Sequence, residues 1–345
     1  MFETVCMGGL LKDIIDALEK PLAYPHSTAN IKRIITGASA VFLTGTKAYK
    51  LNKPVNFGFL DFSTLEKRKD QCEKEYRYNS RISPGLYLGV VAITKDELGK
   101  ITLGGPGKVI EYAVMMNQLD PSFIMSDLLK QGKVSRMHLH DIADKIFSFH
   151  QQAHTDAEIS SFGSLKSIRF NWDENFEQTE KYRQSIISGK DFQSMQTKIN
   201  EFIEKNKELF DKRANGGKIK HCHGDFHSAN VFITPDGIYI FDGIVFNQRF
   251  PCSDIIAEIA FMAMDLEFHG RKDLAEAFIS RYQELSRDGD IPHLLDFYKC
   301  YRAYIRAKIN CFTSEDNNLT EEERNGAVSS ARQYFLLAKD YADKL

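Results

Sequence analysis

The sequence predicts an α+β protein in two parts, a small part built on an antiparallel sheet and a larger, mainly helical part. Short β-branched and aromatic runs fill residues 31–51 and recur at residues 86–94 and 108–114. Beyond residue 134, longer segments carry apolar residues at helical spacing. At 345 residues the chain is long enough for two such parts, each with its own core.

Charge and cysteine content narrow the class of protein. Lys and Arg total 45 against 47 acidic residues, so a net charge of -2 gives no general attraction to nucleic acid. No segment approaches the run of about 18 apolar residues that a membrane span needs. The cysteines show no C-x-x-C spacing, which indicates reduced thiols, at Cys6, Cys72, Cys222, Cys252, Cys300 and Cys311. We therefore expect a cytoplasmic protein that binds neither nucleic acid nor membrane; the oligomeric state stays open.

The N-terminal part is expected to begin with a helix and continue as strands. Residues 10–18 have apolar residues at helical spacing, which predicts an amphipathic helix that ends before Pro21. Three strands follow with only short breaks between them, at residues 31–36, 41–44 and 48–51. Breaks of this length favour antiparallel pairing of neighbouring strands.

Residues 66–81 predict the one helix that lies among these strands. The segment is strongly charged but keeps an apolar line, so most of its charges are expected on a solvated face. Strands at residues 86–94 and 108–114 come next, and the glycine-rich run Gly104-Gly105-Pro106-Gly107-Lys108 lies between them. That run lacks the spacing of a phosphate-binding P-loop, so we interpret it as a turn.

The second part is predicted to be mainly helical. Residues 134–154 have the periodicity of a core helix. His150 and His154 have the spacing of a zinc-protease helix, but Gln151 replaces the glutamate that would activate water, so we expect no metal there. Residues 160–217 are polar and mostly helical, whereas residues 255–268 are apolar nearly all round and predict a buried helix.

The chemistry concentrates in residues 221–243, HCHGDFHSANVFITPDGIYIFDG. Two apolar runs joined by Pro235-Asp236-Gly237 predict a hairpin that returns Asp242 to the side of Asn230. Amide and carboxylate oxygens are ligands that magnesium takes together with substrate phosphates. Asp225 precedes Asn230 at the spacing of a kinase catalytic loop, in which the aspartate orients the acceptor hydroxyl. Turn formation explains any one of these residues but not their order and spacing together.

The run H-G-D-x-H-x-x-N, followed by a hairpin and Asp, resembles the aminoglycoside phosphotransferase and choline kinase-like enzymes, which share the protein-kinase fold. The stretches VFLTGTKAYKLNKPVNFGFLDFSTLEKR, EYAVMM and FYKCYRAYIRAKI look like an uncharacterised bacterial and archaeal branch of that superfamily. The resemblance covers residues 31–309. In that branch the module is often fused to a P-loop kinase domain; no G-x-x-x-x-G-K-[ST] occurs here, so we expect that domain to be absent.

The resemblance implies a bilobal protein-kinase-like fold. Residues 1–116 would form the small lobe, with an antiparallel sheet and one helix, and bind the nucleotide. Residues 117–345 would form the mainly helical lobe, which contains the catalytic loop at 221–243 and a helical insertion at about 160–217. In the resembled enzymes such an insertion helps form the acceptor pocket.

The resemblance also assigns candidate nucleotide contacts. Lys50 falls where kinase-like enzymes place the lysine that contacts the α- and β-phosphates, and Glu75 matches the helix glutamate that positions it. Gly37 and Ser39 fall in the phosphate-covering loop, although a plain hairpin turn would have the same sequence. Residues 111–116 would connect the lobes and offer backbone groups to adenine, with Glu111, Tyr112, Val114 and Met115 as candidates.

For the larger lobe the resemblance implies ATP and Mg²⁺ as cofactors. Asn230 and Asp242 would hold the metal, and Asp225 would orient the acceptor hydroxyl. His223 would brace the catalytic loop. Asp254 either only caps the helix that it begins or also bonds back to the backbone of this loop, and the two roles are compatible.

These residues predict a kinase that transfers the γ-phosphate of ATP to a hydroxyl of a small molecule. A protein kinase or a nucleotidyl-transferring enzyme with the same fold is the first alternative, because a fold does not determine the acceptor. A non-catalytic nucleotide-binding module is the second. It is disfavoured because the sequence keeps Lys50, Asp225, Asn230 and Asp242 together.

Residues 294–309 predict a helix with a basic stripe of Lys299, Arg302 and Arg306. Carboxylates elsewhere in the protein would be the ordinary partners of such a stripe. Alternatively, Arg302 and Arg306 line the acceptor pocket, with His227 as a further candidate, and the acceptor is then anionic. A cationic aminoglycoside would be repelled unless acidic residues of the 160–217 segment intervene.

Overall fold

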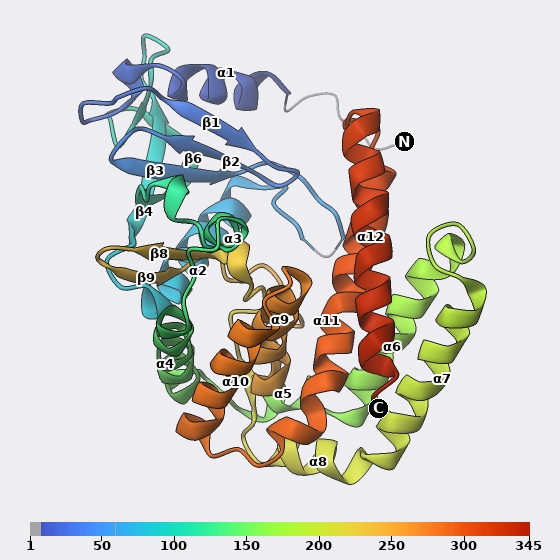
Figure 1. The fold of residues 1–345 in the computed structure, drawn as a ribbon. Coiled ribbons are helices and arrows are strands. Elements are labelled where there is room, and N and C mark those ends of the chain that lie inside the picture. Colours follow the sequence, from blue (N-terminus) through green and yellow to red (C-terminus); the bar gives the residue numbers. More distant parts are fainter. Residues whose placement is uncertain (1–7, 59) are drawn as a thin grey trace. The chain divides into compact units, whose positions relative to one another are not determined.

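The computed structural model describes residues 8–58 and 60–345, so Cys6 lies outside the described residues. The chain divides into two compact units. One unit extends to Ile124 and also includes Phe232–Asn247; the other comprises Met125–Val231 and Gln248–Leu345. The boundary therefore lies a few residues beyond the expected 116/117, and the segment that carries Asp242 belongs to the first unit (Figure 1).

The first unit contains a six-stranded antiparallel sheet in the order β1-β2-β3-β6-β4-β5. Five of the strands were predicted, whereas β5 was not, because three residues are too few to show a period of two. The strands are β1 Lys32–Ile35, β2 Ser39–Leu43, β3 Lys47–Asn52, β4 Tyr87–Lys95, β5 Ile101–Leu103 and β6 Lys108–Asn117.

Helices pack against both faces of this sheet. On one face, α1 (Gly8–Leu18) buries Ile14 and Leu18 in a core shared with Tyr49 and Leu51 of β3. On the other face, α2 (Leu65–Ile82) begins at the side chain of Thr64, which accepts a hydrogen bond from the backbone of Lys67. Because side chains alternate along a strand, Lys50 points away from the α1 core, toward the face that α2 covers.

The structure corrects the assignment of residues 111–116 to a connector. They lie inside β6, which pairs with β3 on one side and β4 on the other, so ladder hydrogen bonds occupy the backbone groups that adenine would need. The side chain of Glu111 is also committed, because Arg68 of α2 donates to it at 2.7 Å. This correction applies equally to Tyr112, Val114 and Met115. The strand ends at Asn117, and the short 3-10 helix η2 (Pro121–Phe123) follows.

The second unit is mainly helical. Its helices are α3 Met125–Lys130, α4 Arg136–Gln152, α5 Ala157–Ser161, α6 Leu165–Thr179, α7 Gly189–Lys205, α8 Lys207–Asn215, α9 Ile255–Phe268, α10 Lys272–Ser286, α11 Ile291–Ser314 and α12 Glu321–Ala342. Two 3-10 turns, η3 (Glu180–Tyr182) and η4 (Ser228–Asn230), and the strands β7 (Ile219–His221) and β10 (Cys252–Asp254) complete it. The long helices α11 and α12 run side by side (Figure 1).

Helix α9 forms the core of this unit, as its sequence predicted. Every residue from Ile255 to Leu266 is buried, including Glu258 and Asp265. Asp254 caps the helix by accepting a hydrogen bond from the backbone of Ile256, and Arg213 of α8 holds the same carboxylate through two hydrogen bonds. This arrangement fixes the start of α9 against the short β7–β10 ladder.

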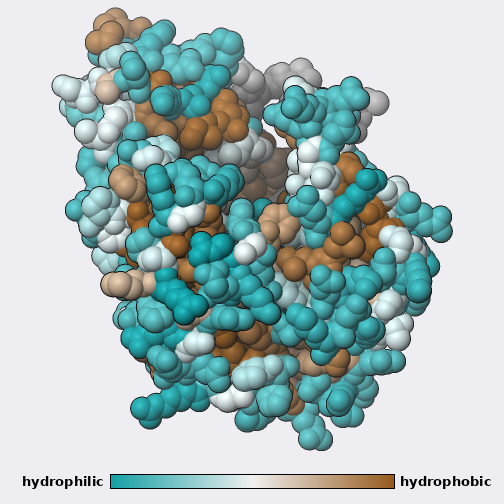
Figure 2. All heavy atoms as spheres, viewed as in Figure 1, coloured by the Kyte–Doolittle hydropathy of each residue, from teal (hydrophilic) through white to brown (hydrophobic). Residues whose placement is uncertain are grey.

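The outer faces of the helices are mainly polar. In the view of Figure 2 hydrophilic side chains cover most of the visible surface of the helical unit, and hydrophobic residues form small groups. None of the helices in the described part of the chain combines the length and the hydrophobicity that a membrane span requires.

Candidate active site

Lys50 is the centre of a charged cluster in the first unit. Its Nζ lies 2.9 Å from Glu75 Oε1 and 2.6 Å from Asp242 Oδ1. Burial opposes the charge of Lys50, but Asp242 and Glu75 outweigh this effect and hold its pKa well above the ordinary value. The two carboxylates therefore favour the charged form of the Lys50 ammonium group.

The backbone around Asp242 is held by α2 and β4. The backbone N–H of Asp242 donates to the Tyr87 hydroxyl at 3.0 Å, and that of Gly243 donates to Asn79 Oδ1 at 2.8 Å. Asp242 has φ of 62°, a left-handed conformation that non-glycine residues seldom adopt. Such strain persists only where the surrounding structure imposes it. The side chain of Asp242 remains 51% exposed. The carboxylate is thus fixed at its base and accessible at its tip.

Sequence reasoning missed Tyr87, Asn79 and Ser83, which hold this segment. Ser83 Oγ exchanges two hydrogen bonds with the backbone of Ile240, the last residue of β9 (Gly237–Ile240). This strand pairs with β8 (Val231–Thr234) in the predicted hairpin. Nothing in the order of residues indicates that small polar groups of α2 contact a hairpin about 160 positions later.

The turn at Gly37 and Ser39 is tight. Ser39 begins β2, and its backbone N–H and hydroxyl are both committed to the Thr36 hydroxyl, at 3.0 and 2.9 Å. Gly37 is exposed, with open space where a Cβ would lie. Only the glycine end of this turn therefore keeps the close backbone access that a phosphate would need.

In the second unit, Asp225 and Asn230 form one hydrogen-bonded group. The Asn230 side-chain nitrogen donates to the Asp225 carboxylate and to the Asp225 carbonyl, both at 2.9 Å. His227 Nε2 lies 3.5 Å from the same carboxylate, while its Nδ1 accepts a hydrogen bond from the backbone of Ala229. The predicted spacing therefore places catalytic-loop residues in direct contact.

The pKa of Asp225 lies below its ordinary value. Burial by itself would raise this pKa, but the hydrogen bond from His227 and the charges of His227, Arg306 and His223 outweigh it. The Asp225 side chain is 38% exposed. Asp225 is thus an ionised carboxylate with an accessible edge, suited to orient a hydroxyl and to receive its proton late in a transfer.

Glu258 braces the catalytic loop from inside α9. Its two carboxylate oxygens accept hydrogen bonds from the backbone N–H groups of His223 and Gly224, at 2.8 and 2.7 Å. Asp254, the residue expected from the sequence as a candidate for this role, instead caps α9 and pairs with Arg213. A glutamate in the first turn of a helix that is apolar nearly all round was the signal for Glu258, since a buried charge requires partners.

The side chain of His223 contacts the backbone of the loop. It is fully buried, and its Nδ1 accepts a hydrogen bond from the backbone of Asp225 at 3.4 Å. This contact ties the ring to the backbone of Asp225, and the bracing role of His223 stays a prediction.

His150, Cys222 and Glu258 are all buried, and each offers an atom of metal-ligand type within 4.8 Å of the others. Their hydrogen bonds account for the cluster without a metal. His150 contacts Tyr282 through Nδ1 at 2.7 Å and Glu258 through Nε2 at 3.0 Å. Burial also raises the pKa of the Cys222 thiol well above its ordinary value, which disfavours the thiolate that metals bind. The cluster is the support of the catalytic loop.

Replacement of Glu258 by Gln is expected to lower the free energy of unfolding by about 3 kcal/mol, because two backbone donors and His150 lose a charged partner. Urea titrations measure this change. The variant Glu276→Gln is the control, since Glu276 is exposed in α10 and its pair with Lys272 contributes little. Equal stability of the two variants would contradict the bracing role.

The loss of stability on acidification provides a second test of the role of Glu258. Burial would raise its pKa, but the hydrogen bond from His150, the charges of His150 and His223 and the Gly224 N–H lower it overall. A lowered pKa stabilises the fold above the ordinary value of 4.5, and this stability is lost as pH falls through the folded value. Wild type should therefore lose more stability than Glu258→Gln between neutral pH and acid.

The basic residues of the stripe on α11 have different kinds of partner. Lys299 pairs with Glu267 and Asp296, at 3.0 and 2.8 Å. Arg302 is buried and donates to the backbone carbonyls of Ala257 and Gly224, at 3.0 and 3.2 Å. These contacts place Arg302 behind the catalytic loop, where it braces Gly224, and they do not support a place in an acceptor pocket.

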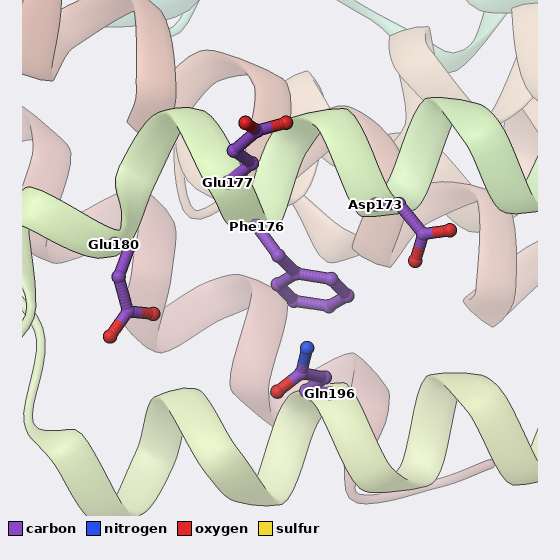
Figure 3. Close-up of a pocket in the computed structure, with 5 residues that line it drawn as sticks. All are labelled: Asp173, Phe176, Glu177, Glu180 and Gln196. Atoms are coloured by element: carbon purple, nitrogen blue, oxygen red, sulfur yellow. The ribbon is translucent and has the colours of Figure 1, made fainter.

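The helical insertion contains an acidic hollow between α6 and α7 (Figure 3). Its volume is about 590 Å³, and it is lined by Asp173, Phe176, Glu177, Glu180 and Gln196. Three of these five residues are carboxylates of the α6 segment. A hollow of this charge suits cations better than anions.

The sequence relatives of this chain are described only as uncharacterised proteins. No family model matches the chain. Uncharacterised proteins of Mycobacterium tuberculosis and Mycobacterium bovis are 30% identical to it over 276 residues. The match covers 80% of this chain and 54% of each relative, so the chain spans about half the length of the curated relatives it matches.

Solved structures define the class of fold. The chain has the fold of the aminoglycoside phosphotransferase and choline kinase-like superfamily, as its motifs predicted. One match is a choline kinase from Cryptosporidium parvum. The match covers 95% of this chain and 95% of that kinase, with a TM-score of 0.55 and 13% identity. A second match is a Ralstonia eutropha protein described as a candidate aminoglycoside phosphotransferase. The match covers 96% of this chain and 98% of that protein, with a TM-score of 0.52 and 13% identity. A third match is a glucosamine kinase in complex with glucosamine, ADP and inorganic phosphate. The match covers 94% of this chain and 82% of that kinase, with a TM-score of 0.50 and 12% identity.

Proposed function

We propose that this protein is an ATP-dependent kinase that phosphorylates a hydroxyl group of a small molecule. The observation that carries the proposal is the contact of Lys50 with both Glu75 and Asp242 within one unit. In kinases a strand lysine paired with a helix glutamate contacts the nucleotide phosphates, and an aspartate holds the metal. The second unit contributes the other half of the pattern, Asp225 hydrogen-bonded to Asn230.

The residues fit magnesium and ATP. The Asn230 side-chain nitrogen donates twice to Asp225, and its amide oxygen accepts no hydrogen bond from the described residues. Asp242 offers an accessible carboxylate. Each of these two residues would therefore offer the ion an oxygen ligand, and the ion when bound neutralises charge on the phosphates. Adenine contacts would come from the backbone after Asn117, since residues 111–116 are occupied in β6.

Catalysis by these residues would consist of positioning and proton handling. Lys50 would bind the phosphates, held at its charge by Glu75. Asp225 would accept a hydrogen bond from the acceptor hydroxyl and align it for in-line attack. It would take the hydroxyl proton as the new P–O bond forms and the bond from the γ-phosphorus to ADP breaks. Glu258, His223 and Arg302 keep the loop in the required conformation through the backbone contacts described above.

Transfer of label from ATP tests the proposal. The protein would be incubated with magnesium and γ-labelled ATP in the presence of a panel of hydroxylated metabolites, and the products would be separated by size. Label on a small molecule supports the proposal. Label on protein supports a protein kinase, and transfer from α-labelled ATP supports a nucleotidyl-transferring enzyme. Nucleotide binding without turnover across the panel favours a non-catalytic module.

Replacement of Lys50 by Met is expected to reduce transfer by roughly 100-fold or more, because the phosphates lose a charge-assisted contact that orients them. The measurement is the rate of transfer at saturating ATP. Lys100→Met is the control, since Lys100 is exposed in the turn between β4 and β5 of the same unit. Equal rates for the two variants would contradict the role of Lys50.

A further inference from the structure

Arg306 differs from the other members of the basic stripe on α11 in lacking an ion-pair partner. Lys299 has two carboxylates and Arg302 has two backbone carbonyls. Within residues 8–58 and 60–345, no carboxylate lies at ion-pair distance from Arg306, and its buried Nε has no hydrogen-bond acceptor. Its guanidinium carbon lies 5.6 Å from the centre of the Tyr334 ring on α12.

The surroundings of Arg306 connect it to the catalytic loop. Burial opposes its charge, whereas Tyr334, Asp225 and Asp265 favour it and raise its pKa. Asp265 of α9 accepts a hydrogen bond from the backbone N–H of Ser228, three residues after Asp225. The charge of Arg306 in turn helps to keep Asp225 ionised. Arg306 therefore belongs to the environment of the proposed catalytic carboxylate.

A second polar atom in this region also lacks a partner. Ser228 is buried, and its Oγ makes no hydrogen bond within the described part of the chain. The two nearby carboxylates are committed, Asp265 to the Ser228 backbone and Asp225 to Asn230 and His227. Leaving buried donors without acceptors costs free energy, about 1–3 kcal/mol for each group. An acceptor group supplied by a ligand would remove that cost.

We propose that Arg306 binds an anionic group, a carboxylate or phosphate, of the small molecule whose hydroxyl faces Asp225. A guanidinium binds such groups through parallel N–H donors, which fixes orientation as well as charge. An anion beside the ionised Asp225 would otherwise be repelled, and Arg306 offsets that repulsion. The proposal rests on the kinase function proposed above and names its class of acceptor.

A cationic acceptor is the competing outcome. Arg306 would repel an ammonium group, so a cation would have to be bound elsewhere, and the acidic hollow between α6 and α7 is suited to it. The carboxylates of Asp173 and Glu177 allow this outcome to be tested in the same assay.

Matched pairs of acceptors distinguish an anionic from a cationic acceptor. Wild-type protein would be assayed for transfer from γ-labelled ATP to glycerate against glycerol, to ribose 5-phosphate against ribose, and to choline and glucosamine. We expect at least one anionic member to be phosphorylated with a kcat/KM at least tenfold above its neutral counterpart. Preference for choline or glucosamine, lost in Asp173→Asn/Glu177→Gln, would overturn the proposal.

The variant Arg306→Gln tests the residue itself. It is expected to raise the KM for the anionic acceptor roughly 30-fold or more, with the KM for ATP unchanged. Arg306→Lys should recover part of the affinity, and Lys299→Gln should leave the acceptor KM unchanged because its partners are Glu267 and Asp296. An unchanged acceptor KM in Arg306→Gln would overturn the proposal, as would an equal loss of hydrolysis and transfer in both arginine variants.

A binding measurement separates failure of this inference from failure of the kinase function. Inorganic phosphate is expected to raise the melting temperature of wild type and of Lys50→Met but not of Arg306→Gln. Loss of the shift in Lys50→Met alone would place the phosphate at the nucleotide site and overturn the inference while leaving the kinase function intact. Absence of nucleotide binding and of any transfer would instead contradict the kinase function.

Discussion

Replacement of Asp225 by Asn is expected to lower the turnover number by a factor of at least about 100, with the fold and the affinity for ATP nearly unchanged. The amide keeps the size of the side chain and can still accept the hydrogen bond from Asn230. It cannot take a proton from the acceptor hydroxyl, and it removes the negative charge that orients that hydroxyl. Single-turnover transfer to an identified acceptor measures the effect.

The control for this variant is Asp236→Asn. Asp236 lies exposed in the turn between β8 and β9, a short distance along the chain, so its loss of charge should leave turnover unchanged. Thermal unfolding checks that Asp225→Asn is folded. Near wild-type turnover of Asp225→Asn would remove Asp225 from its proposed role.

Replacement of Asp242 by Ala should weaken the magnesium-dependent binding of ATP by at least roughly 10- to 100-fold, since loss of an outer-shell partner alone has effects of that size. Lys50 would keep Glu75 as its partner, so the Lys50 ammonium group should remain in place. Affinity for a fluorescent ATP analogue would be measured with magnesium and with a chelator. The difference between the two conditions isolates the metal contribution.

Two further variants define the result for Asp242. Asp242→Asn keeps an oxygen ligand and should retain part of the magnesium dependence. Tyr87→Phe removes the hydroxyl that accepts the hydrogen bond from the Asp242 backbone, so it tests whether the strained conformation of this residue is needed. Full magnesium dependence in Asp242→Ala would count against the metal assignment.

Local sequence predicted the elements and the chemical groups of the site. Periods of two and of 3.6 residues located β3, α2 and the buried α9 within a few residues, because each reflects the burial of one face of one element. The order Asp225, Asn230, hairpin, Asp242 indicated a kinase pattern because a short stretch of chain carries it. The hydrogen bond between Asp225 and Asn230 lies within that stretch.

The misassigned connector shows a limit of this reasoning. Residues 111–116 read equally well as a strand or as an extended connector, because both need an apolar segment without turn residues. Pairing with β3 and β4 decided between them, and the partner strands lie tens of residues away in the chain. Register with distant strands is a property of the sheet and not of the segment.

The amino-acid sequence by itself determined which residues could carry phosphoryl transfer, since side-chain chemistry and spacing belong to the chain. Tertiary structure alone decided which buried charges have partners. Glu258 took the loop-bracing role offered to Asp254, and Arg302 was satisfied by backbone carbonyls. Arg306, at the same helical spacing, retained a donor without an acceptor. The physical reason is that the free energy of a buried charge depends on the groups around it, and folding brings those groups from distant parts of the chain.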